Sequence, residues 1–360
     1  MLRNSKIGMY VYPVVAPEFT NWRDEQGAWR DHAVLFDQTH HMDELNVEGP
    51  DAETFLNYIC GANVSVPAGK IVYTQFLNPR GGIEADVTFV RLAKDRFYLI
   101  TGSGFGVRDT DWIKRHITAT DAVHLVDVTS AMAVINIAGP KARAVLASAS
   151  ESDVSNAALP FSQARDIVVG AAPIRALRIG YVGELGYELH IPTEFAAHVY
   201  DTLWAAGQTA GIVNAGYRAI ESLRMEKGYV YWSGDISPDH TPVEAGLGPR
   251  VHLKFKGDFL GKAALAAQKA GQLERRLCTF ATPLNLPLTG GETILLGERV
   301  VSLATSVGFG HTVGQTILRG YLDRAHWASA DFEIEVFGER YPISQVEGPL
   351  YDPANERLKG

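Results

Sequence analysis

Residues 178–192 read RIGYVGELGYELHIP, and the rest of the chain is interpreted outward from this stretch. Its residues alternate in polarity up to Gly183 and Gly186 and alternate again beyond them, a pattern typical of a β-hairpin. Glu184 is expected at the tip of the turn. Because a single carboxylate in a turn is usually solvated, its function depends on what surrounds it.

A helix and an aromatic loop are expected after the hairpin. Residues 216–227 have helical spacing of apolar residues, and Arg224 stands near the end of this segment. The following loop is punctuated by Gly and Pro and carries polar and aromatic side chains: Tyr229, Tyr231, Trp232 and Glu244. Such a concentration around one loop predicts a pocket for a flat ligand with a polar edge.

These strings resemble the pterin-binding signature of the glycine-cleavage T-protein superfamily, the tetrahydrofolate-dependent one-carbon transferases. The resemblance implies tetrahydrofolate as the cofactor. It implies that Glu184 accepts paired hydrogen bonds from the amino-pyrimidinone edge of the pterin, as a carboxylate does well. It also implies that Arg224 holds Glu184 or a folate carbonyl, with Tyr181 and Trp232 completing the cofactor site.

Composition limits the class of protein. With 360 residues, 46% of them apolar, the chain is long enough for two or three domains. The net charge of -8 argues against a nucleic-acid surface. An apolar run of about 18 residues and a signal-peptide core are both missing from the sequence, so neither membrane insertion nor export is expected. Cys60 and Cys278 form no metal or disulfide pattern, which favours the cytoplasm and predicts no metal site.

An internal repeat decides the fold class. Residues 46–56 read NVEGPDAETFL, and residues 136–146 read NIAGPKARAVL. Each copy predicts a strand ending at Gly, then Pro at the first helical position of an amphipathic helix. The sequence therefore predicts an α+β fold with a pseudo-duplicated α/β domain and antiparallel sheets, and the resemblance implies that this domain binds folate. The expected boundaries are 1–270 for two α+β subdomains, with repeat units starting near 46 and 136, and 271–360 for a small antiparallel β-barrel.

A second hairpin carries the candidate functional acid. Residues 72–91 read as two strands joined by a turn at Gly81 and Gly82, and Asp86 lies within the second strand, where Asp is uncommon. The superfamily has two successive Asp residues here, whereas this chain has Ala85 followed by Asp86. The resemblance implies that Asp86 lies near the N5/N10 edge of folate and orients or polarises the reacting nitrogen.

The amino-terminal segment narrows the resemblance. The run YVYP at 10–13, the run NWRDEQ at 21–26 and the PLYDP run at 349–353 look like the tetrahydrofolate-dependent aromatic O-demethylases that act on vanillate or 3-O-methylgallate. His40 and His41 are adjacent, so on a strand they would point to opposite faces and would not share one metal ion. The resemblance to this branch places four side chains at the substrate end: Tyr12, Gln38, His41 and Tyr229.

The favoured function is transfer of a methyl group from an aromatic methyl ether to N5 of tetrahydrofolate. Such an ether is a poor electrophile, so the enzyme must align the reactants and protonate or stabilise the leaving oxygen. Tyr229 is expected to assist the leaving group, with Tyr231 as its rival, and Asp86 and His41 complete the catalytic set. Three alternatives stay open: aminomethyl transfer as in the T-protein, N- or S-demethylation, and a folate-binding regulatory protein without transfer. The expected partner is a small methyl donor, and the oligomeric state is left open.

Overall fold

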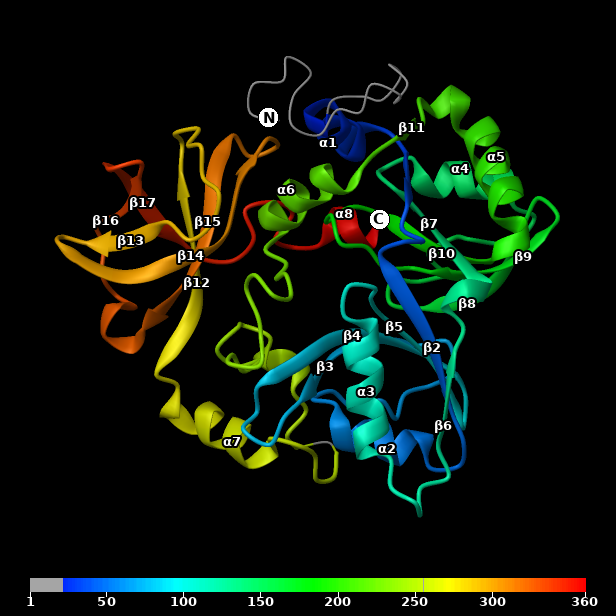
Figure 1. Cartoon of the computed structure of the whole chain (residues 1–360). Helices are drawn as coiled ribbons and strands as arrows, with labels where there is room; N and C mark the ends of the chain where they lie inside the picture. The colour runs from blue at the N-terminus through cyan, green and yellow to red at the C-terminus, as the bar shows by residue number, and fades with distance from the viewer. Residues whose placement is uncertain (1–21, 255) are drawn as a thin grey trace, which may run out of the picture.

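The computed structural model describes residues 22–254 and 256–360, which form two sheets with helices and a barrel (Figure 1). Tyr12, expected at the substrate end, lies outside the described residues. The first sheet has the order β11-β1-β7-β10-β9-β8. Its strands are β1 (Val34–Asp37), β7 (Met132–Ala138), β8 (Ala164–Val169), β9 (Ala172–Leu177), β10 (Gly186–Pro192) and β11 (Val213–Asn214).

The second sheet has the order β3-β4-β5-β2-β6. Its strands are β2 (Met42–Glu48), β3 (Ile71–Leu77), β4 (Ile83–Ala93), β5 (Arg96–Gly102) and β6 (His124–Asp127). Eight α-helices lie within the described residues: α1 (Trp22–Asp31), α2 (Ala52–Ile59), α3 (Gly106–His116), α4 (Ala142–Ala149), α5 (Ala196–Gly207), α6 (Tyr217–Lys227), α7 (Lys262–Ala267) and α8 (Glu356–Lys359).

The duplication predicted from the sequence is confirmed by the topology. The chain order β2-α2-β3-β4-β5-α3 returns as β7-α4-β8-β9-β10-α5, and the strands take the same spatial order in both sheets. Gly49 and Gly139 end the equivalent strands at φ values of 126° and 112°. An added Cβ would meet the Ala122 carbonyl oxygen at 2.1 Å or the His32 carbonyl oxygen at 2.3 Å, so both positions need glycine.

The start of each repeat helix was predicted two residues too early. Helix α2 begins at Ala52 and α4 at Ala142, so Pro50 and Pro140 lie in the preceding turns. Their fixed φ suits a turn as well as a first helical turn, and sequence alone does not distinguish these positions.

Helices cover the outer faces of both sheets, and α1 and α6 also pack on part of the inner face of the first sheet, at Val34 and Phe36. The outer face of the first sheet packs on α4 and α5, and that of the second sheet packs on α2 and α3. The inner faces turn toward each other, and a smaller cluster that includes Ile71, Val90, Ile100 and Leu177 fills part of the space between them. Strand alternation therefore sends every second side chain of both sheets into one shared layer.

The hairpin expected at 174–192 is confirmed only in its strands. Strands β9 and β10 pair antiparallel, with Glu188 opposite Leu177, but residues 178–185 form a long loop instead of a tight turn. Arg178 is buried and donates to the carbonyl oxygens of Leu358 and Lys359 at 3.1 and 3.0 Å. Glu184 lies in this connecting loop, two residues before β10, but it is buried and not solvated as a lone carboxylate in a turn usually is.

The barrel predicted at the carboxyl end is confirmed and is closed, in the order β12-β15-β14-β13-β16-β17. Its strands are β12 (Arg275–Thr282), β13 (Thr293–Leu296), β14 (Arg299–Gly310), β15 (Gln315–Asp323), β16 (Phe332–Val336) and β17 (Glu339–Val346). Sequence reasoning missed β17, whose run is interrupted by Pro342, yet this strand closes the barrel by pairing with β16 and β12.

Candidate functional site

Polar side chains line the inner face of the first sheet. Asn136 of β7 lies opposite Phe36 of β1 on one side and Glu188 of β10 on the other. His190 follows Glu188 by two residues and therefore shares its face. Gln38, two residues beyond Phe36, is buried and donates its backbone N–H to Val134 at 2.8 Å. The four side chains thus form a polar patch in the layer between the sheets.

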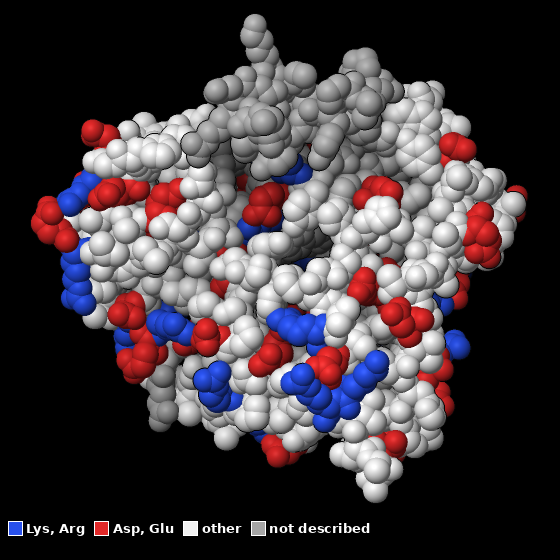
Figure 2. Space-filling view, viewed as in Figure 1, with Lys and Arg blue, Asp and Glu red and all other residues white. Residues whose placement is uncertain are grey.

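Polar residues of the second sheet face this patch. The Tyr98 hydroxyl of β5 lies 2.9 Å from Nδ1 of His190, and Oε1 of Glu44 lies 3.9 Å from the same nitrogen. By strand alternation Tyr73, Asp86 and Gln75 also point into this layer. Figure 2 shows this side of the molecule hollowed near its middle, and in the same view Figure 1 has α6 and α8 above that point and β4 below it.

Many of these side chains have polar atoms without partners. Among the described residues, the following buried inner-layer atoms have no hydrogen-bond partner: Oε1 of Gln38, Oε1 of Glu44, Nε2 and Oε1 of Gln75, Oδ1 of Asn136 and Nε2 of His190. Leaving one such atom unpaired costs about 1–3 kcal/mol, so native proteins pair almost all of them. The layer therefore offers hydrogen-bonding positions to a polar-edged ligand or to water.

Glu188 is an inner-layer carboxylate with unused hydrogen-bonding capacity. It is 6% exposed, and Nε2 of His190, at 3.8 Å from Oε2, is the cation-forming group near it. Within the described part of the chain, its carboxylate accepts no hydrogen bond. Two carboxylate oxygens can accept two parallel N–H donors, so Glu188 offers the bidentate geometry that suits a heterocycle edge.

Glu44 is held in its protonated form near neutral pH. Burial, and then the nearby carboxylates of Asp43 and Glu188, raise its pKa to about 8. A protonated Glu44 beside His190 adds an O–H donor to the layer. Its neighbour Tyr98 is also buried, and burial raises the pKa of that phenol.

Asp86 is partly buried in the layer and is not a fully solvated strand residue. The Tyr73 hydroxyl donates to its Oδ2 at 3.0 Å. Burial raises the pKa of Asp86 to about 6, although this hydrogen bond acts in the opposite direction. The group therefore changes charge within the range in which many enzymes work, as expected of a residue that exchanges a proton or a hydrogen bond with a ligand.

Aromatic side chains wall this region. The rings of Tyr181 and Tyr229 stack with centroids 5.6 Å apart, and the Tyr181 hydroxyl donates to the Val230 carbonyl oxygen at 2.5 Å. Burial raises the pKa of Tyr229 to about 12, so its phenol stays protonated and can donate. Burial, and to a lesser extent the Asp86 carboxylate, raise the pKa of Tyr181.

Trp232 and Tyr231 are the other two aromatic candidates, and they contact different neighbours. Trp232 packs on Phe105 at 4.4 Å between centroids and lies under the Arg108 guanidinium at 3.9 Å. Burial, and then the neighbouring Tyr231 phenol, raise the pKa of Tyr217. Tyr217 in turn stacks on His41 at 4.9 Å, so Tyr231 is linked to the surface position of His41 and not to the Tyr181 pair.

His41 and Gln38 differ in their exposure to solvent. His41 is exposed and lies between the rings of Phe36 and Tyr217, at 5.8 and 4.9 Å between centroids. Gln38 is buried beside the polar patch. The two residues, expected together at the substrate end, therefore occupy the rim and the interior respectively.

Glu184 is fully occupied by the chain itself. It accepts from Nη1 of Arg30 at 3.1 Å and from Nε of Arg357 at 3.1 Å to each oxygen, and it accepts the Tyr351 hydroxyl. Its side chain is 1% exposed. These contacts give Glu184 an architectural role that joins α1, the 178–185 loop and the carboxyl-terminal segment.

Arg224 does not contact Glu184, contrary to one expectation from the sequence. It is buried, and its Nη1 donates to Oδ2 of Asp235 at 2.9 Å and to the Tyr229 carbonyl oxygen at 3.1 Å. Its Nη2 donates to the Ser306 hydroxyl of β14 at 2.8 Å and to Glu221. Arg224 therefore fixes the 229–235 loop, including the position of Tyr229, against the barrel.

Sequence reasoning missed several inner-layer residues, above all Glu188, Asn136 and His190. A signal for two of them was present, because Glu188 and His190 are polar residues at alternate positions of an otherwise apolar strand. Two polar side chains on one buried face of a strand are unusual. The contribution of Asn136 depends on strand pairing, which spacing along the sequence does not give.

The described helices include none that is long and apolar enough to cross a membrane. Two family models match the chain: the GCVT N-terminal domain over residues 8–255, and the glycine cleavage T-protein C-terminal barrel domain over residues 275–352. A solved relative, the glycine cleavage system aminomethyltransferase T from Bartonella henselae, is 27% identical and superposes with a TM-score of 0.83, covering 95% of this chain and 91% of that one.

Curated relatives include dehydrogenases, oxidases and transferases. Human mitochondrial sarcosine dehydrogenase is 36% identical over 96% of this chain and 40% of its own length. The 4-methylaminobutanoate oxidase (formaldehyde-forming) of Paenarthrobacter nicotinovorans is 37% identical over 94% of this chain and 42% of its own length. An aminomethyltransferase of Symbiobacterium thermophilum is 29% identical over 94% of this chain and 92% of its own length.

The chain thus spans about two fifths of the dehydrogenase and oxidase relatives and nearly the whole of the aminomethyltransferase. The comparisons cover both the duplicated α+β region and the barrel. The chain belongs to the GCVT family, the family of the glycine cleavage T-protein.

Proposed function

We propose that the chain is a tetrahydrofolate-dependent one-carbon transferase that binds the edge of the pterin through Glu188, with Asn136 and Gln38 beside it. The observation that carries this proposal is the row of buried acceptors with spare capacity on the inner face of the first sheet. The amino-pyrimidinone edge of a pterin presents adjacent N–H donors. Pairing these donors with the Glu188 carboxylate and a neighbouring amide would satisfy both sides.

The sequence-based assignment of the pterin to Glu184 stays a prediction, and its contacts do not favour it. A pterin at Glu184 would have to displace Arg30, Arg357 and the Tyr351 hydroxyl. Removing a partner from a buried ion pair costs several kcal/mol. A pterin that binds at Glu188 would displace no such partner, because the Glu188 carboxylate accepts no hydrogen bond within the described residues.

Asp86 is proposed as the acid that orients the reacting nitrogen of folate. Above its pKa of about 6 it is a carboxylate and can accept a hydrogen bond or a proton from an amine. Tyr229, protonated and held by its stack on Tyr181, is the proposed donor to the leaving group. Tyr231 is less suitable because its phenol lies near Tyr217, which stacks on the exposed His41.

The one-carbon donor is proposed to be an amine. The names of three relatives, 36, 31 and 37% identical, refer to sarcosine, dimethylglycine and 4-methylaminobutanoate, which are N-methylated amino acids. This choice is the N-linked branch of the sequence-based alternatives, and it includes aminomethyl transfer. Aromatic O-demethylation stays a second candidate, because the Phe36, His41 and Tyr217 rings offer a flat face at the rim on which an aryl ether could stack.

A product assay distinguishes these candidates. Tetrahydrofolate is incubated with the chain and one of several donors: a lipoyl carrier protein loaded with aminomethyl, dimethylglycine, vanillate, syringate or 3-O-methylgallate. Formation of 5,10-methylenetetrahydrofolate from the aminomethyl carrier, with no product from the aryl ethers, is the expected result. Formation of 5-methyltetrahydrofolate from an aryl ether would select O-demethylation instead.

The binding part of the proposal has its own test. Tetrahydrofolate affinity of the full chain is measured by fluorescence titration without a donor, so that a wrong donor does not affect the result. Tight binding with no product from any donor would leave a folate-binding regulatory protein as the function. Absence of tetrahydrofolate binding would overturn the proposal as a whole.

A further inference from the structure

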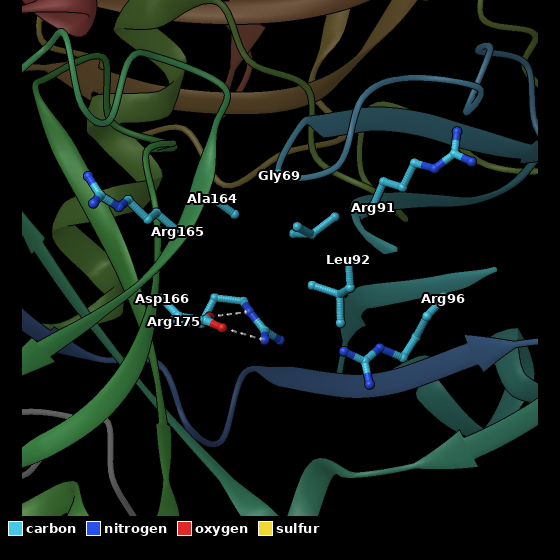
Figure 3. Close-up of a pocket in the computed structure, with 9 residues that line it drawn as sticks. Gly69, Arg91, Leu92, Arg96, Ala164, Arg165, Asp166 and Arg175 are labelled. Carbon is cyan, nitrogen blue, oxygen red and sulfur yellow. Dashed lines mark hydrogen bonds and ion pairs between the residues drawn. The ribbon is translucent and has the colours of Figure 1, made fainter. Parts of the chain in front are cut away.

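A cationic cavity of about 140 Å³ lies where β4 and β5 of the second sheet meet β8 and β9 of the first (Figure 3). Arginines from all four strands line it: Arg91, Arg96, Arg165 and Arg175. The acidic residue among its lining residues is Asp166, which pairs with Nε of Arg175 at 2.9 Å. In a chain of net charge -8, four arginines around one opening are a marked local excess of positive charge.

The four arginines are not equivalent. In Figure 3, Arg96 and Arg175 point toward the middle of the cavity from opposite sides, while Arg91 and Arg165 point away from it. The Arg91 guanidinium is used by the carbonyl oxygens of Val66 and Lys94, each at 2.9 Å. The Arg96 guanidinium has no hydrogen bond or ion pair within the described residues, whereas that of Arg175 is paired with the exposed carboxylate of Asp166 through Nε and Nη2. An anion placed between Arg96 and Arg175 would accept from the free Arg96 guanidinium and from the remaining nitrogen of Arg175.

An apolar slot continues from these two arginines. A second cavity, of about 230 Å³, shares Leu92, Arg96 and Arg175 with the first. The rest of its lining is mainly apolar: Val128, Ala131, Met132 and the ring of Tyr98, with Asn46. The Arg175 guanidinium lies 5.5 Å from the centre of the Tyr98 ring. The two cavities together present two cations at the entrance and carbon-rich walls behind them.

We propose that this slot binds a small organic carboxylate, with the carboxylate between Arg96 and Arg175 and a short apolar body against Leu92, Met132 and the Tyr98 ring. Guanidinium groups match planar carboxylates through paired hydrogen bonds. The apolar walls favour such a ligand over inorganic anions, because an inorganic anion has no apolar part to pack against them. The slot adjoins the Glu188 patch through Tyr98, whose ring lines the slot and whose hydroxyl contacts His190, but this inference does not depend on the proposed function.

The test measures binding of butanoate to the full chain at low ionic strength by isothermal titration calorimetry. Butanoate should bind, whereas neutral butanamide and inorganic phosphate should bind at least about tenfold more weakly. Arg96→Gln and Arg175→Gln should each weaken butanoate binding by about tenfold. Arg165→Gln is the matched control, because Arg165 lines the same cavity but points away, and it should bind butanoate like the wild type.

The inference is overturned if butanoate does not bind at millimolar concentration, or if all three variants bind it equally. Equal affinity for butanamide would also overturn it, because the negative charge would then play no part in recognition. Equal affinity for phosphate would overturn it too, because the apolar body of the ligand would then play no part. Circular dichroism establishes that each variant is folded. Should Arg175→Gln fail to fold, the exposed residue Arg96 on β5 decides the outcome alone.

Discussion

Glu184 and Glu188 lie four residues apart in the 178–192 segment, but the fold gives their carboxylates very different numbers of hydrogen-bond partners. Glu184, in the loop before β10, is surrounded by two arginines and a tyrosine. Glu188, on β10 itself, faces the layer between the sheets with a histidine 3.8 Å away and open acceptor sites. A carboxylate whose hydrogen-bonding capacity is used internally supports the structure, whereas one with capacity left over is available to a ligand.

The largest expected effect is on folding, from Glu184→Gln. This change leaves Arg30 and Arg357 without their shared carboxylate, and breaking a buried pair costs about 3–5 kcal/mol. Urea unfolding should show a correspondingly lower midpoint. The control is Glu298→Gln, the same chemical change at an exposed pair with Arg340, which should hardly move the midpoint. Equal stability of both variants would contradict the architectural role of Glu184.

The next effect is on binding, from Glu188→Gln. Replacing the carboxylate by an amide removes one acceptor and its charge, and the dissociation constant for tetrahydrofolate should rise about 10- to 100-fold. The unfolding midpoint should stay close to that of the wild type, because Glu188 has few internal contacts to lose. Fluorescence titration measures the affinity. If Glu184→Gln weakened tetrahydrofolate binding more than Glu188→Gln, the comparison would be reversed.

Much of the fold was predictable from the sequence, but the site was predictable only in part. Alternation and the repeated Gly-Pro pairs indicate the duplicated sheets, because those patterns follow from local backbone geometry. The roles of Glu184 and Glu188 depend instead on contacts that are remote in sequence. Arg30 and Arg357 lie 154 and 173 positions from Glu184, and Tyr98 lies 92 positions from His190. Residue type and spacing do not report such contacts.

A smaller effect concerns Glu44, the carboxyl across the layer from Glu188. Its folded pKa of about 8 exceeds its unfolded value of 4.5, so the folded state binds the extra proton and stability falls as pH rises from about 4.5 to 8. Glu44→Gln mimics the protonated form. It should raise the free energy of unfolding at pH 8 by roughly 1–3 kcal/mol and change it little at pH 4.5. Urea unfolding at both pH values measures this, and a gain that is the same at both would refute it.

The smallest expected effect is a shift in a pH profile. If Asp86 must be ionised for transfer, kcat/KM should fall below pH 6, in line with its pKa of about 6. Tyr73→Phe removes a hydrogen bond that lowers this pKa, so the acidic limb should move upward by roughly half a unit. Asp86→Asn should abolish the limb. A limb that stays in place in Tyr73→Phe would assign it to another group.

Asp235 limits how this protein can be recombined with its relatives. Its buried carboxylate accepts from Arg224 of α6 at 2.9 Å, from Arg319 of β15 at 3.4 Å and from the Thr305 hydroxyl of β14 at 2.7 Å. A barrel grafted from another protein without counterparts of Arg319 and Thr305 would leave this charge undercompensated in the interior, at a cost of about 3–5 kcal/mol. Chimaeras of this family therefore need to inherit both sides of the Asp235 junction together.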